Sequence, residues 1–249
     1  MTEAEWLECT DPQPRLDFLR GKVSDRKLRL FAVGCCRRIW RHFEDKRSRR
    51  AVEVAERYAD GLASDEELDE AEDAAGDANC DGMGAASAAV PPASADAYDA
   101  ASALADPDYT LYDHFLDAVY HQWDASCGDY YTGKEKVGST ASRKPSIERK
   151  ISRVARARIE AERGAQARLL RDTFGNPLHP VAFDASWLKP DVTKLAKTIS
   201  DQRAFDRLPE LADALAEARC DDAEVLAHCR EPGEHVRGCW VVDLILGKE

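Results

Sequence analysis

Residues 26–40 read RKLRLFAVGCCRRIW, and this stretch predicts the class of fold for the whole chain. Its apolar residues recur at intervals of three or four: Leu28, Phe31, Cys35 and Ile39. Such spacing places the side chains on one face of a helix, while arginines occupy the rest of the surface. Ser24 stands where a capping residue is expected. We therefore predict a long helix that buries its apolar face in a core.

Helix signals continue outward from this stretch in both directions. Capping boxes, in which a Ser, Thr or Asp precedes a Glu by three residues, occur at Thr2–Glu5, Ser64–Glu67 and Asp221–Glu224. The longest regular pattern begins at Ser146 and ends near Phe174, where Gly175 and Pro177 stop it. Alternating strand patterns are hard to find. The sequence predicts an all-α protein, an irregular helical bundle whose N- and C-terminal helices pack together around a variable acidic middle.

Charge is sorted along the chain. Residues 59–130 hold eighteen acidic and no basic residues, whereas residues 20–50 hold twelve basic and three acidic ones, and residues 131–172 twelve and five. Opposite charges attract, so we expect the acidic stretch to fold against its basic neighbours.

Composition along the chain suggests three parts. They are an N-terminal helical subdomain at 1–75, an acidic insert of helices and loops at 76–145, and a C-terminal helical subdomain at 146–249. Glycine-rich stretches at 76–92 and 126–145 are typical of loops, and we expect little regular structure there.

Several functional classes lack their sequence signals. There is no Walker loop, dinucleotide fingerprint, nucleophile elbow or HExxH helix. No leader pattern and no run of about 20 apolar residues is present, which predicts a cytoplasmic protein without a membrane partner. Eight cysteines in 249 residues are too sparse for a disulfide-stapled domain, so we expect reduced thiols.

Two blocks of sequence carry a resemblance to a known family. RKLRLFAVGCCRRIW at 26–40 and HCREPGEHVRGCWVVDLILGK at 228–248 resemble an uncharacterised all-helical protein family expanded in planctomycete bacteria, as do FGNP at 174–177 and RAFDRLPELADAL at 203–215. The resemblance covers roughly residues 1–61 and 159–248. It implies one helical unit built from both ends of the chain, and it implies no activity.

The C-terminal block contains a candidate metal site. His235 and Cys239 lie four residues apart in a predicted terminal helix, and His228 precedes them. Zinc prefers about four nitrogen or sulfur ligands, and Cys229, Cys35 or Cys36 would complete the set if the first and last helices touch. The alternative is an apolar core helix with a hydrogen-bonded histidine, because the spacing matches no recognised zinc finger.

A second candidate combines His114, Asp117 and His121. These residues lie on one predicted helix at spacings of three and four, so they project from adjacent turns. A hydrolytic metal centre of this kind draws further ligands from other helices, and the sequence identifies none. An aromatic packing helix with polar flanks is the simpler interpretation.

Two other groups of residues are candidate sites. The basic segment 143–171 has the charge to bind nucleic acid but lacks aromatic residues that stack on bases, so a solvated or acid-paired helix face is favoured. Cys36 and Cys229 each precede an arginine, which favours a lowered thiol pKa, although buried inert thiols are the default.

The sequence therefore favours a non-enzymatic, regulatory module that binds another protein. A zinc-binding or other metal-binding bundle, structural or hydrolytic, is the main alternative, and nucleic-acid binding through residues 143–171 is a further one.

Overall fold

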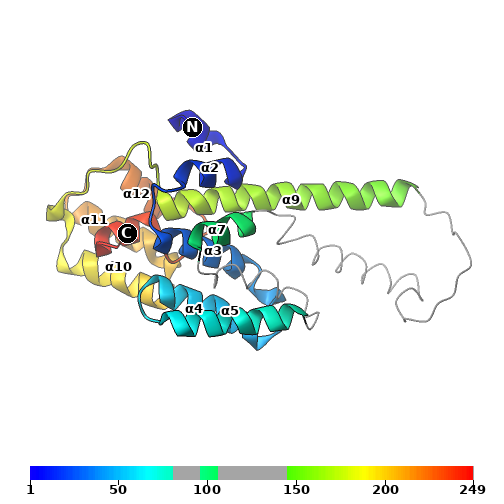
Figure 1. Cartoon of the computed structure of the whole chain (residues 1–249). Helices are drawn as coiled ribbons and strands as arrows, with labels where there is room; N and C mark the ends of the chain where they lie inside the picture. Colours follow the sequence, from blue (N-terminus) through cyan, green and yellow to red (C-terminus); the bar gives the residue numbers. More distant parts are fainter. Residues whose placement is uncertain (81–95, 106–144, 249) are drawn as a thin grey trace, which may run out of the picture.

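The computed structural model describes residues 1–80, 96–105 and 145–248, and every regular element in these ranges is a helix (Figure 1). The prediction of an all-α fold is therefore confirmed. The helices before residue 106 are α1 (Glu3–Glu8), α2 (Pro12–Leu19), α3 (Asp25–Arg38), α4 (Lys46–Ala59), α5 (Asp65–Cys80) and α7 (Ala97–Ala105). Those that follow are α9 (Pro145–Phe174), α10 (Pro190–Gln202), α11 (Leu208–Glu217), α12 (Ala223–Arg230) and α13 (Trp240–Leu246).

Helix α3 forms the centre of a first hydrophobic core. Ser24 caps its first turn by accepting a hydrogen bond from the Lys27 amide at 3.3 Å. The apolar face buries Phe31 completely and packs against α4, α7 and α9. Each such buried Leu or Phe stabilises the fold by about 1.5–3 kcal/mol. The stretch that predicted the fold thus lies at the middle of this core.

Part of the acidic stretch belongs to the same core. Helix α7 contacts α3 and α2, and its Ala101 and Leu104 are fully buried. Acidic side chains of the stretch also meet basic neighbours, since Asp60 pairs with Arg26 at 2.9 Å and Glu67 with Arg57 at 2.6 Å.

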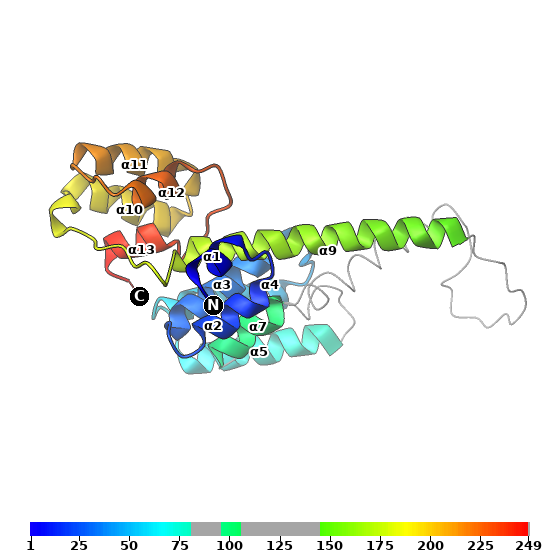
Figure 2. The ribbon, with the colours of Figure 1, turned by 90° about the horizontal axis from the view of Figure 1, so that it is seen from above.

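A second hydrophobic core is formed by α10, α11, α12 and α13. Ile199, Leu211, Val225 and Val241 are fully buried there. Two views show these helices grouped at one end of α9, and the N-terminal helices lie along the adjoining half of α9 (Figures 1 and 2).

Helix α9 connects the two cores. Leu169 and Leu170 are buried in the first core, and the last turn of α9 contacts α13 (Figure 2). Gly175 ends the helix with φ +62°, and a Cβ atom there would lie 3.1 Å from the Trp240 ring. Only glycine combines this left-handed backbone with so close an indole.

Buried ion pairs hold the two groups of helices together. Asp60, at the end of α4, pairs with Arg26 at 2.9 Å and with Arg237 at 2.8 Å. Asp243 of α13 pairs with Arg26 and with Lys27, each at 2.7 Å. Both carboxylates are 3% exposed, so their charges depend on these partners rather than on water.

The predicted start of the terminal helix is wrong by several residues. Helix α13 begins at Trp240, and residues 231–239 are non-helical. Pro232 and Gly233 disfavour helix, and Gly238 has φ +98°, where a Cβ atom would lie 3.0 Å from Leu30 Cβ. His235 and Cys239 therefore share no helix face.

We predict that Asp60→Asn lowers the free energy of unfolding by about 3–5 kcal/mol at pH 7, because it leaves buried cations without their partner. Burial alone would raise the pKa of Asp60, but Arg26 and Arg237 outweigh it and the pKa is lowered. The carboxylate therefore stabilises the fold above the pKa of the unfolded chain, near 3.8, and this stabilisation is lost as the pH falls through the lower folded value.

Urea unfolding followed by circular dichroism measures this difference. Asp69→Asn, which changes an exposed acid of α5, is the matched control and should alter stability by less than about 0.5 kcal/mol. Equal stability of Asp60→Asn and Asp69→Asn would contradict the role given to the Asp60 ion pairs.

Candidate metal centre

A buried carboxylate lies in the last turn of α9. Asp172 is 4% exposed, and its Oδ2 atom accepts a hydrogen bond from the Val236 amide at 2.9 Å. A negative charge is disfavoured at this position by the negative end of the helix dipole. Burial adds a further cost, so the carboxylate requires compensating partners.

Those partners come from the C-terminal segment. His228 lies in the last turn of α12, Cys239 is the N-cap residue of α13, and His235 lies in the non-helical segment between them. The bend at Gly238 turns the chain back so that the three side chains converge on Asp172.

The four side chains form a single cluster. His235 Nδ1 lies 2.6 Å from Asp172 Oδ1, and His228 Nε2 lies 3.2 Å from the same oxygen. His228 Nε2 is also 3.1 Å from Cys239 Sγ. One donor atom from each of the four residues lies within 4.8 Å of the other three.

The protonation of the cluster follows from burial and pairing. Burial acts to raise the pKa of Asp172, but hydrogen bonds from His228 and His235 outweigh it and the pKa is lowered. Burial acts to lower the pKa of His235, but its bond to Asp172 reverses the sign and the pKa is raised. Burial raises the pKa of Cys239 well above its ordinary value. Without a metal, the lowered pKa of Asp172 and the raised pKa of His235 favour a carboxylate–imidazolium pair, and the raised pKa of Cys239 favours a neutral thiol.

The donor set suits zinc. Carboxylate oxygen, imidazole nitrogen and thiolate sulfur are its usual ligands, and bond lengths of about 2.0–2.3 Å in a tetrahedron place donors roughly 3.3–3.7 Å apart. Three of the distances between donor atoms are 2.6–3.2 Å and all are within 4.8 Å, so adjustments of about 1 Å would meet this geometry. One carboxylate and one thiolate would also balance the two charges of the ion.

Groups behind the ligands hold them in place. The Val236 amide fixes one oxygen of Asp172 and leaves the other directed at the cluster. His235 Nε2 lies 3.4 Å from the Glu231 carbonyl, which favours a proton on Nε2 and a free Nδ1 when a metal binds. The Trp240 ring packs against the His228 ring with centroids 5.2 Å apart. Such outer contacts orient metal ligands.

The structure brings together the three C-terminal candidates and adds one that the sequence analysis missed. His228, His235 and Cys239 meet Asp172. Of the residues offered to complete the set, Cys35 and Cys36 lie in the first core, and Cys229 is buried in the second core and is not a member of the cluster. The only sequence signal at Asp172 is an acid in the final turn of a predicted helix, where the helix dipole disfavours a negative charge.

For Cys36 and Cys229 the default expectation of buried inert thiols is confirmed, and the alternative of a lowered thiol pKa is not. Burial raises the pKa of Cys229 to about 12 although Arg230 is adjacent, and burial also raises that of Cys36 beside Arg37. Desolvation outweighs the neighbouring charge in each case. Neither residue is an activated nucleophile.

The remaining candidates are the set at residues 114–121 and the basic segment 143–171. His114, Asp117 and His121 lie outside the described residues. Of the basic segment, Arg156 and Arg168 are exposed on α9, while Arg171 donates to the Leu7 carbonyl at 2.8 Å. Among the described helices, none has the length and apolar character needed to cross a membrane.

Comparison with known proteins identifies no relative of this chain. No protein-family model matches the chain, and neither a curated protein nor a solved structure matches it.

Proposed function

We propose that this protein binds one zinc ion through Asp172, His228, His235 and Cys239. The observation that carries the proposal is the convergence of four donors of the right chemical types within 4.8 Å, two of them on buried residues and two on half-buried ones. They come from α9 on one side and from residues 228–239 on the other. The ion would therefore tie the C-terminal helices to the helix that also enters the first core.

The arrangement favours a structural rather than a hydrolytic site. Catalytic zinc usually has three protein ligands and an open position for water, whereas structural zinc has four protein ligands. The side chains of His228, His235 and Asp172 are only 13%, 10% and 4% exposed, and Cys239 is fully buried. A site enclosed in this way leaves little room for a substrate.

The ion would also change the electrostatics of the joint between the cores. In its absence one buried carboxylate relies on histidine protonation. Zinc would replace that proton with a permanent charge, and its binding energy would add to the free energy of folding. Binding of another protein, which the sequence favours, remains a prediction; nucleic-acid binding remains the less favoured alternative, and the family resemblance also remains a prediction.

We predict that the protein purified without added metal contains close to one equivalent of zinc. His235→Ala should lose it, because three remaining ligands hold the ion less tightly. His179→Ala is the matched control, since His179 is an exposed histidine outside the cluster. Elemental analysis after dialysis measures the content. A zinc content below about a tenth of an equivalent, together with no binding of added zinc at micromolar concentration, would contradict the proposal.

Cobalt provides a test of ligand identity that does not rely on a variant folding well. The cobalt-loaded wild-type protein should show the intense visible bands of tetrahedral coordination and a charge-transfer band from the Cys239 thiolate. Cys239→Ser should lose the charge-transfer band, whereas Cys220→Ser, a buried cysteine outside the cluster, should keep it. Octahedral spectra in the wild type would contradict the proposed ligand set.

Removal of zinc should destabilise the protein. Free zinc at about a thousand times its dissociation constant stabilises the native state by about 4 kcal/mol, so a strong chelator should lower the melting temperature markedly. Differential scanning calorimetry with and without the chelator measures the shift. In Asp172→Asn the chelator should have little further effect. A chelator effect of the same size in Asp172→Asn and wild type would place the metal elsewhere.

Zinc affinity should rise with pH. The pKa of Cys239 and that of His235 are both raised in the metal-free protein, so both groups must lose protons for the metal to bind. At pH 7 we expect release of about one to two protons per zinc. Calorimetric titration in buffers of different ionisation enthalpy counts these protons, and release of none would exclude Cys239 as a thiolate ligand.

A further inference from the structure

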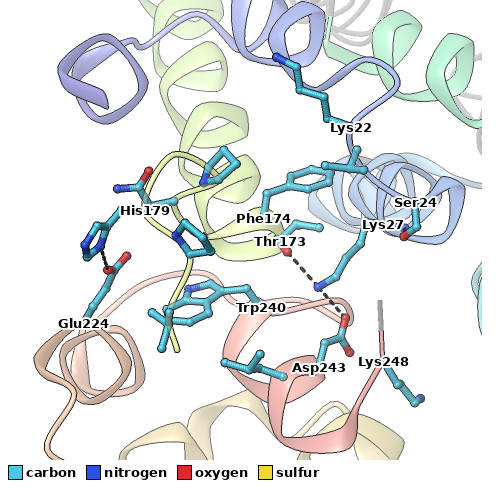
Figure 3. A pocket seen from close by; sticks show the side chains of 17 residues that line it. Lys22, Ser24, Lys27, Thr173, Phe174, His179, Glu224, Trp240, Asp243 and Lys248 are labelled. Carbon is cyan, nitrogen blue, oxygen red and sulfur yellow. Dashed lines mark hydrogen bonds and ion pairs between the residues drawn. The ribbon is translucent and has the colours of Figure 1, made fainter. Parts of the chain in front are cut away.

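A cavity of about 360 Å³ lies between the two groups of helices (Figure 3). Its lining comes from the turn before α3, from the segment after α9, and from α12 and α13. The volume falls in the range of small-molecule sites, and the position between two packed units is one that such sites favour. None of the four proposed zinc ligands lines it.

Most of the wall is apolar and part of it is aromatic. The residues responsible are Val23, Phe174, Pro180, Val181, Trp240 and Leu244. Trp240 is half-buried, and Figure 3 shows its indole between the His179 side and the Lys27 side of the cavity. A flat ring is the shape that gains most from stacking beside an indole.

The charges around the cavity are predominantly positive. Three lysines line it, Lys22, Lys27 and Lys248, against the two carboxylates of Asp243 and Glu224; Lys27 pairs with Asp243 at 2.7 Å. Lys22 is exposed, its ammonium lies over the Phe18 ring at 3.5 Å, and no carboxylate of the described residues pairs with it. The start of α3, a 14-residue helix capped by Ser24, adds partial positive charge on the same side.

The ion-pair network beside the cavity increases this excess. Lys248, which lines the cavity, lies 3.4 Å from Asp60, a carboxylate that already binds Arg26 and Arg237. The network of Asp60 and Asp243 therefore holds two carboxylates against four cations: Arg26, Lys27, Arg237 and Lys248. An anion in the cavity would reduce the mutual repulsion of these cations.

We propose that this cavity binds a small aromatic carboxylic acid. The ring would lie among the apolar side chains beside Trp240, and the carboxylate would face Lys22 and the start of α3. Neither part alone explains the lining, because a simple anion leaves the apolar wall in water and a neutral ring leaves the excess cations unmatched.

Three probes separate the two contributions: indole-3-acetate, indole and inorganic phosphate. Titration followed by the Trp240 indole signal in nitrogen-15 NMR measures each affinity in the protein as purified. Indole-3-acetate should bind with a dissociation constant below about 1 mM, and indole and phosphate should each bind about tenfold more weakly. Equal affinities for the acid and indole, or for the acid and phosphate, would overturn the proposal.

Variants test the location. Lys22→Ala should weaken the binding of indole-3-acetate about three- to fivefold and leave that of indole unchanged, because it removes one exposed charge. Lys194→Ala, an exposed lysine of α10 that does not line the cavity, is the control and should change neither. Val181→Phe should weaken both ring probes by filling the cavity.

These results can be interpreted separately from zinc binding because the cavity and the metal cluster share no side chain, although Trp240 lines the cavity and its ring packs against that of His228. Failure of the metal experiments would leave the expected pattern of probe binding unchanged. No movement of the Trp240 signal at about 10 mM indole-3-acetate, or equal effects of Lys22→Ala and Lys194→Ala, would overturn the aromatic-acid site.

Discussion

The burial of one carboxylate constrains much of the C-terminal half of this protein. Asp172 is fully enclosed at the end of a helix where the backbone dipole opposes its charge. Leaving such a group unpaired would cost several kcal/mol of folding free energy, more than any single surface contact contributes. Residues 228–239 provide its partners. The placement of these partners depends on the non-helical segment, on the bend at Gly238 and on the start of α13 at Trp240.

The same segment also serves the joint between the cores. Arg237 projects to Asp60 while its neighbour Val236 donates to Asp172, so adjacent residues meet carboxylates from two different helices. Lys27 joins in from α3 by donating to the Gly238 and Thr173 carbonyls at 2.7 and 3.0 Å. Buried charges of this kind fix orientation because a shifted packing would leave them unmatched. The two cores therefore have one defined arrangement rather than a sliding apolar contact.

Local sequence patterns predicted the parts of the fold that depend on local physics. The 28–39 periodicity, the Ser24 cap and the glycine stop after Phe174 all appear where expected, because helix formation and capping depend on neighbouring residues. Histidine and cysteine chemistry singled out His228, His235 and Cys239. Asp172 escaped notice because its significance comes from burial, which only the tertiary packing of α9 determines. The error in α13 has a similar origin, since apolar periodicity around Val236 hid the backbone effect of Gly238.

The order of Asp172, His228, His235 and Cys239 along the chain has a consequence for biosynthesis. Asp172 leaves the ribosome well before the three residues that surround it, and the helices of α10 and α11 are made in between. Until His228 and the residues beyond it emerge, burial of the Asp172 carboxylate would cost free energy without compensating partners, so the last turn of α9 stays solvated. Docking of the C-terminal helices is then a late step of folding, driven when a solvated acid acquires its partners.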